Sequence, residues 1–205
     1  MRLLLVRHGE TDWNLARRYQ SYSDVPLNQK GIRQAQYLAQ RLSKEKIDAI
    51  YSSDLSRATE TAILIAKKYE PLLAVQCDPR LRELSFGNWE GLNYQEIQEQ
   101  WHTEVNSWFA DPVNVSPPNG ETMTQLSARV RSALGELQSK HQDETILIVS
   151  HGGIIQVLLC MLLGVGLNRY WQFHVIPAAL TEIRIYEAGA ILDIFNDTSH
   201  LKVLE

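Results

Sequence analysis

The sequence has little of what stabilises very small domains or anchors a protein in a membrane. Its two cysteines, Cys77 and Cys160, are too few and too far apart for a disulfide framework or a local metal clip, so we expect two buried, free thiols. No apolar run reaches the roughly 18 residues that a membrane span needs. The N-terminal segment meets a charge too early for a signal peptide. We therefore expect a cytoplasmic protein without a membrane partner.

Neither sign of charge dominates the chain. Its 20 Lys and Arg residues oppose 24 Asp and Glu residues, which leaves a net charge of −4. This balance provides no overall positive field for nucleic acid, so we expect no nucleic-acid partner. A chain of 205 residues buries enough surface to need neither disulfides nor metals for stability. We expect a single domain over residues 1–205.

Short apolar runs alternate with amphipathic segments along most of the chain. Strands are expected at residues 2–6, 47–51, 72–75 and 145–149, and as a hairpin at 180–186 and 191–195. Helices are expected at residues 29–42, from the cap residues 52–54 through 66, at 121–140 and at 152–167. This alternation predicts an α/β layer fold with parallel strands.

Residues 88–120 differ in composition from the rest. The first part, about 89–109, is amphipathic and rich in Trp, Gln and Glu, and the second part is rich in turn residues. We predict a helical and loop insertion that covers one end of the sheet. Five aromatic residues in it either pack together or line an apolar pocket: Trp89, Tyr94, Trp101, Trp108 and Phe109.

Two predicted strands end in the same way. His8 follows the first strand and His151 follows the strand at 145–149, and each histidine precedes a glycine. The carboxyl edge of a parallel sheet is where ligands bind in open α/β folds. A single histidine in this position is usually structural, but two in matching context favour a functional site.

Three more residues fit a site for phosphate chemistry. Arg7 and Arg57 also follow strands, and forked guanidinium groups suit phosphoryl oxygens. Glu83 lies just after the third predicted strand and is a candidate proton donor to a leaving alkoxide. Three other carboxylates compete with it for this role: Glu90, Glu96 and Glu99.

Other catalytic motifs are absent from the sequence. There is no P-loop, no H-E-x-x-H and no G-x-S-x-G, and no Asp-x-Asp pair offers magnesium ligands. Neither cysteine has an arginine six residues later, which a cysteine-based phosphatase loop requires. A histidine nucleophile remains, because a neutral imidazole can attack phosphorus while arginines offset the charge of the transferring group.

Four segments resemble the signatures of the histidine phosphatase superfamily, which includes the cofactor-dependent phosphoglycerate mutases. They are LVRHGETDWN at 5–14, SDLSRATETA at 53–62, LRE at 81–83 with FGNWEG at 86–91, and VSHGG at 149–153. They occur in the family's order and span almost the whole chain. Together with the alternating elements, the resemblance implies a three-layer α/β/α sandwich around a mostly parallel sheet with an antiparallel edge.

The resemblance also implies a role for each matching residue. His8 would form phosphohistidine, with Glu83 as the acid and base. The phosphoryl oxygens would be held by Arg7, Arg57 and His151. Further substrate contacts would come from Asn14, Gln20, Ser21 and Gly152. No metal or organic cofactor is implied.

Several features resemble the phosphatase branch of this family more than the mutases. Glu10-Thr11 follows the nucleophile, and Ser21 stands where mutases usually have glycine. The expected function is a metal-independent phosphomonoesterase acting on a small phosphate ester, with α-ribazole 5′-phosphate as one candidate. A broad-specificity or phosphoserine phosphatase is the alternative, and a phosphoglycerate mutase a weaker one. A homodimer remains open, because the edge hairpin and the aromatic insertion each offer a surface for one.

Overall fold

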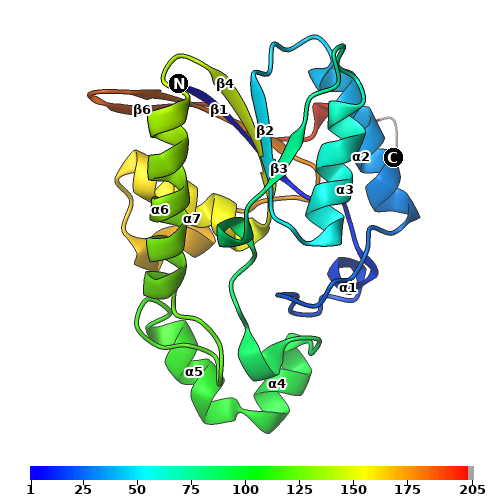
Figure 1. Ribbon diagram of the computed structural model, residues 1–205. Coiled ribbons are helices and arrows are strands. Elements are labelled where there is room, and N and C mark those ends of the chain that lie inside the picture. The colour runs from blue at the N-terminus through cyan, green and yellow to red at the C-terminus, as the bar shows by residue number, and fades with distance from the viewer. Residues whose placement is uncertain (203–205) are drawn as a thin grey trace.

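A computed structural model describes residues 1–202 and contains one six-stranded sheet (Figure 1). The strands are β1 (Arg2–Arg7), β2 (Ala49–Ser52), β3 (Val75–Cys77), β4 (Thr145–Ser150), β5 (Leu180–Tyr186) and β6 (Gly189–Asp197). Their order is β3-β2-β4-β1-β5-β6. The first four strands in this order are mutually parallel, whereas β5 and β6 pair antiparallel. The predicted mostly parallel sheet with an antiparallel edge is confirmed.

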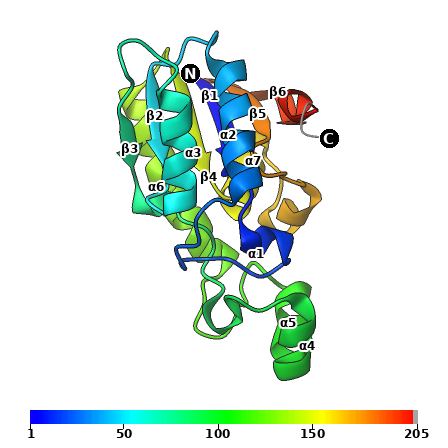
Figure 2. The same cartoon turned by 90° about the vertical axis from the view of Figure 1, so that its right-hand side faces the viewer.

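Helices cover both faces of the sheet. The α-helices are α1 (Asp12–Leu15), α2 (Gln29–Leu42), α3 (Ser56–Ala66), α4 (Tyr94–Gln100), α5 (His102–Ala110), α6 (Met123–Lys140) and α7 (Gly152–Leu163). The 3₁₀ helices are η1 (Pro79–Leu81), η2 (Gly87–Trp89), η3 (Leu167–Gln172) and η4 (Ser199–Leu201). Figure 2 shows the sheet from the side of α2 and α3, with α6 and α7 behind it.

The strand sequence itself sorts side chains between the two faces. On β1, Leu4 and Val6 pack in the core under α2 and α3. Leu3 and Leu5 point the other way, into the core formed with α6 and α7. All four side chains are fully buried, as expected for a parallel strand covered on both sides. The result is the predicted three-layer α/β/α sandwich.

The helix boundaries follow from local capping. Asn28 accepts a hydrogen bond from Gly31 N at 2.8 Å and starts α2, as predicted. The helix expected over 152–167 ends earlier, at Leu163, because Gly164 adopts a left-handed conformation with φ 67°.

Two other predictions need correction. The third strand lies at 75–77 rather than 72–75. Cys160 is buried as expected, but Cys77 is exposed on the short edge strand β3. The predicted helical insertion contains two helices, α4 and α5, because the backbone leaves the helical region at Trp101.

No helix within residues 1–202 is long and apolar enough to cross a membrane. The helices α4 and α5 project beyond one end of the sheet in both views, on the side where α1 also lies (Figures 1 and 2).

Candidate active site

The strand order brings the two predicted histidines together. β1 and β4 are parallel neighbours, with Arg7 paired in register with Ser150. His8 and His151 are the next residues on each strand, and their ring centroids lie 5.1 Å apart in an edge-to-face arrangement. The site therefore forms where two adjacent strands end at the carboxyl edge of the sheet.

His8 is held in a defined orientation and protonation state. Its Nδ1 lies 2.7 Å from the carbonyl oxygen of Gly9, which can only accept, so the hydrogen is on Nδ1. Burial, reinforced by the positive charges of Arg57 and Arg7, holds the pKa of His8 well below its ordinary value of 6.5. The imidazole is therefore neutral near pH 7, and its Nε2 carries a free lone pair.

Arg57 is fully buried at the start of α3, and its positive charge acts on both His8 and His151. Its guanidinium donates to the carbonyl oxygens of Ser21 at 2.7 Å and Ser23 at 3.0 Å. Burial lowers the pKa of Arg57 to about 10, which still leaves it charged near pH 7. Its Nε is buried and has no hydrogen-bond partner among residues 1–202.

Two other groups present the same kind of buried, unpartnered nitrogen. Arg7 donates through Nη1 to Val175 O at 2.7 Å, but its Nε has no partner in the described part of the chain. Neither ring nitrogen of the fully buried His151 has a partner there. Burial, followed by the charge of Arg57, lowers the pKa of His151 well below 6.5. Buried polar groups are normally hydrogen-bonded, so these nitrogens are suited to binding the oxygens of an anion.

Glu83 reaches the same site from the loop after η1. Its carboxylate accepts from Leu84 N at 2.8 Å and from Gly153 N, in the first turn of α7, at 3.1 Å. A Cβ at Gly153 would overlap Glu83 Oε1, so only glycine permits this approach. The carboxylate also lies next to the positive end of the α7 dipole.

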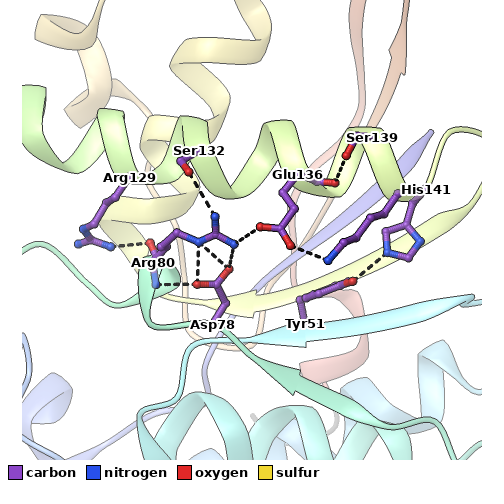
Figure 3. Close-up of polar contacts among 9 residues, drawn as sticks. Tyr51, Asp78, Arg80, Arg129, Ser132, Glu136, Ser139 and His141 are labelled. Carbon is purple, nitrogen blue, oxygen red and sulfur yellow. Dashed lines mark hydrogen bonds and ion pairs between the residues drawn. The ribbon is translucent and has the colours of Figure 1, made fainter.

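Arg129 of α6 holds the backbone around Glu83. It donates to the carbonyl oxygens of Arg80 and Arg82, each at 2.6 Å, and to Glu83 O at 2.9 Å. Figure 3 shows its contact with Arg80. No sequence motif marks Arg129, because it lies in an ordinary amphipathic helix pattern and its hydrogen bonds to this loop end on backbone carbonyls.

The same loop is tied to α6 by ion pairs. Arg80 lies 2.7 Å from both Asp78 and Glu136, and it also donates to the Ser132 hydroxyl (Figure 3). The contacts of Arg80 and Arg129 therefore attach the loop that carries Glu83 to the long helix α6.

A cavity of about 560 Å³ opens above His8. Six of the predicted site residues line it: Arg7, His8, Asn14, Gln20, Glu83 and Gly152. Arg57 and His151 are fully buried and do not line it. The positive charge near His8 comes from Arg57 and Arg7. No cluster of His, Cys, Asp or Glu able to hold a metal ion occurs among residues 1–202.

Three predicted substrate contacts, Asn14, Gln20 and Ser21, follow His8 in the chain, and they differ in their positions relative to the cavity. Asn14 Nδ2 and the Thr11 hydroxyl both lie near Gln20 Oε1, at 3.4 and 2.9 Å, and the buried Gln20 Nε2 has no partner in the described chain. Ser21 does not line the cavity. It is fully buried, and its hydroxyl accepts from Phe86 N at 2.7 Å while its carbonyl holds Arg57.

The aromatic insertion contributes mostly packing. Trp89 is buried in the core, and Tyr94 and Phe109 are exposed. Of the five aromatic residues considered, Trp108 is the one that lines the cavity. Phe86, from the FGNWEG segment, and Tyr19 also line the cavity. Further cavity residues, for which the sequence offered no motif, include Met123, Gln156, Tyr170, Trp171 and His174.

Comparison with known proteins identifies the family. Phosphoserine phosphatase 1 of Hydrogenobacter thermophilus is 35% identical over 201 residues, which cover 98% of this chain and 94% of that protein. Phosphoglycerate mutase-like protein 4 of Arabidopsis thaliana is 44% identical over 158 residues, covering 76% of this chain and 68% of that protein. The crystal structure of the α-ribazole phosphatase from Shigella flexneri matches with a TM-score of 0.89 and 33% identity over 97% of each chain.

The family model described as histidine phosphatase superfamily (branch 1) matches residues 3–198. The enzyme class expected from the motifs, a phosphoric monoester hydrolase, is confirmed. The chain therefore belongs to branch 1 of the histidine phosphatase superfamily.

Proposed function

We propose that the protein is a metal-independent phosphomonoesterase that works through a phosphohistidine on His8. The observation that carries this proposal is the hydrogen bond from His8 Nδ1 to Gly9 O, which leaves Nε2 as the nucleophile on the cavity surface. Arg7, Arg57 and His151 each have a buried nitrogen without a partner among residues 1–202, and these nitrogens supply contacts for the oxygens of the phosphoryl group.

Two chemical steps follow from this arrangement. In the first, His8 Nε2 forms a bond to phosphorus as the ester P–O bond breaks, and Glu83 gives its proton to the leaving oxygen. In the second, water attacks the phosphohistidine, Glu83 takes a proton from that water, and the P–N bond breaks to release inorganic phosphate. The arginines stabilise the charge on the phosphoryl oxygens in both transition states.

The cavity beyond the phosphate site supports a substrate with an aromatic or apolar leaving group. Its walls carry Tyr19, Phe86, Trp108, Tyr170 and Trp171. Aromatic side chains stack on planar rings, so these walls suit a ribosyl-base ester such as α-ribazole 5′-phosphate better than a small charged ester. Relatives named as α-ribazole phosphatases agree with this choice, and a relative named as a phosphoserine phosphatase keeps phosphoserine in the panel to be tested.

The test is phosphate release in the presence of EDTA from α-ribazole 5′-phosphate, phosphoserine, 3-phosphoglycerate and p-nitrophenyl phosphate. We expect hydrolysis without added metal and the highest kcat/KM for α-ribazole 5′-phosphate. Similar values for all esters would instead indicate broad specificity. Loss of activity in EDTA would contradict the metal-independent mechanism. Isomerisation of phosphoglycerate primed by 2,3-bisphosphoglycerate, with little phosphate released, would show a mutase.

A further inference from the structure

The segment of residues 175–178, between η3 and β5, contacts both Arg7 and His8. Its Val175 carbonyl accepts from Arg7 Nη1 at 2.7 Å. Its Ala178 N–H donates to Arg7 O at 2.9 Å and lies 3.3 Å from His8 O. One short segment therefore holds the guanidinium of Arg7 and also the backbone that carries the nucleophile.

This segment has an unfavourable backbone conformation. Ala178 has φ 58°, in the left-handed region that residues with a Cβ seldom adopt, and it is fully buried. Such a conformation persists only where the surrounding structure holds it in place. The contacts that hold the 175–178 segment therefore also bear on the position of His8.

Two side chains near the end of the described chain supply these contacts. Asn196 of β6 accepts from Ile176 N at 2.8 Å through Oδ1. His200 of η4 lies with Nε2 2.9 Å from Ala178 O, and since a carbonyl only accepts, Nε2 is the donor. Neither residue lines the cavity above His8.

His200 is itself oriented by α2. Its Nδ1 lies 3.2 Å from Arg41 Nη1, and a guanidinium only donates, so Nδ1 accepts. Arg41 Nη2 in turn pairs with Asp197 at 2.6 Å. The imidazole is thus the neutral tautomer with its hydrogen on Nε2, the one that bonds Ala178. Burial lowers the pKa of His200, in keeping with a neutral ring.

We propose that His200 and Asn196 are positioning residues for catalysis: they brace the 175–178 segment, which in turn sets the placement of Arg7 and His8. Neither residue touches the substrate. The inference rests on the proposed function, in which His8 is the nucleophile and Arg7 holds the phosphoryl group. It adds β6 and η4, which carry Asn196 and His200, to the parts of the molecule on which turnover depends.

The first test replaces His200 with Leu, which removes the donor to Ala178, and with Gln, whose amide can still donate. Leu201→Ala is the matched control, because Leu201 is buried in the same turn and its apolar side chain carries no group that could hydrogen-bond to the 175–178 segment. For p-nitrophenyl phosphate we expect H200L to lower kcat by about 10- to 100-fold, since small displacements of reacting groups have effects of this size. H200Q should recover much of that loss, and L201A should keep kcat within about twofold.

Asn196→Gly is a second variant in case H200L does not fold. Asn196 has φ 52°, which glycine adopts without strain, so the substitution removes the acceptor for Ile176 N and keeps the backbone conformation. We expect a lower kcat here as well.

A binding measurement separates this inference from the proposed function. Titration calorimetry with inorganic phosphate, together with the ¹⁵N shifts of the His8 ring, reports on the site without turnover. Weaker phosphate binding and altered ¹⁵N shifts of His8 in H200L, with both restored in H200Q, would support the positioning role of His200. Wild-type binding, shifts and kcat in both H200L and N196G would overturn it. A wild-type enzyme that hydrolyses no ester would instead contradict the proposed function, whatever the binding data show.

Discussion

The backbone N–H of Gly153 donates to both carboxylate oxygens of Glu83, each at 3.1 Å. Gly153 lies in the first turn of α7, and His151 is the N-cap residue of the same helix. The start of one buried helix thus positions both the candidate acid and one of the candidate phosphate ligands. A substitution at this point is expected to disturb the site without replacing a side chain that reacts.

Gly153→Ala is the direct test of that contact. The added Cβ would overlap Glu83 Oε1 and push the carboxylate away from its bonding position. We expect kcat for an alkyl phosphate to fall by roughly 10- to 100-fold, because the proton donor is displaced. Gly135→Ala in α6 is the matched control, since a Cβ there meets no atom within 4 Å.

The control should be more stable than the wild type by about 0.5–1 kcal/mol, because alanine is favoured over glycine inside a helix. Its activity should be unchanged. Wild-type kinetics in Gly153→Ala would show that Glu83 does not need this contact.

Glu83→Gln tests the role of the acid through the leaving group. For an alkyl phosphate such as phosphoserine, which needs protonation of the leaving oxygen, we expect kcat/KM to fall by about 10²- to 10⁴-fold. For p-nitrophenyl phosphate, whose leaving group is stable as the anion, the loss should be much smaller. Steady-state kinetics on both esters, with exposed Glu99→Gln as the control, make the comparison. Equal losses on both esters would exclude Glu83 as the proton donor.

His8→Ala removes the proposed nucleophile. We expect turnover to fall by at least about 10⁴-fold, since loss of a nucleophile leaves only binding and electrostatic contributions. Rapid quenching of the wild type at high pH, followed by ³¹P NMR, should show phosphohistidine that is absent from the variant. The exposed His102→Ala is the control, because it changes a histidine outside the cavity. A variant that kept its activity would require a different nucleophile.

The buried histidines predict how stability depends on pH. The folded-state pKa values of His8 and His151 lie well below 6.5, so below that pH the unfolded chain binds more protons than the folded protein. Stability therefore rises with pH through this range and is lost as the pH falls below about 6.5. Each histidine adds up to about 1.4 kcal/mol per pH unit to the slope.

Urea unfolding between pH 7.5 and pH 5.5 measures this slope. His151→Asn should make this slope shallower by up to about 1.4 kcal/mol per pH unit, because the unfolded chain then binds one proton fewer. A slope in the wild type that matched His151→Asn would mean that His151 is not held neutral in the fold.

Much of the site was predictable from local pattern. A short apolar run that ends in polar residues predicts a buried strand and the edge at which it stops, and this was sufficient for His8 and His151. Glu83 also lies where the chain returns to that edge. The helix over Gln29–Leu42 was predicted because the cap at Asn28 and the spacing of apolar residues both act within one helix.

Other features depended on contacts between distant segments. The prediction of a helical insertion did not place a boundary at Trp101, because the sequence is amphipathic on both sides of it. Cys77 was expected to be buried, but it lies on β3, a strand of only three residues. The strand order places β3 at the edge of the sheet, where Cys77 is exposed. Ser21 follows the nucleophile segment closely in the chain, yet it does not line the cavity, and its hydroxyl accepts from Phe86 N.

Local sequence pattern was enough to predict the family, the layered α/β fold and most residues of the candidate site. Other relationships appear only in the folded chain: β1 and β4 are neighbours, Arg129 holds the loop of Glu83, and residues 175–178 hold Arg7 and His8. These contacts are made to backbone N–H and C=O groups. Because almost every residue provides such groups, no side-chain motif in the sequence marks where the contacts form.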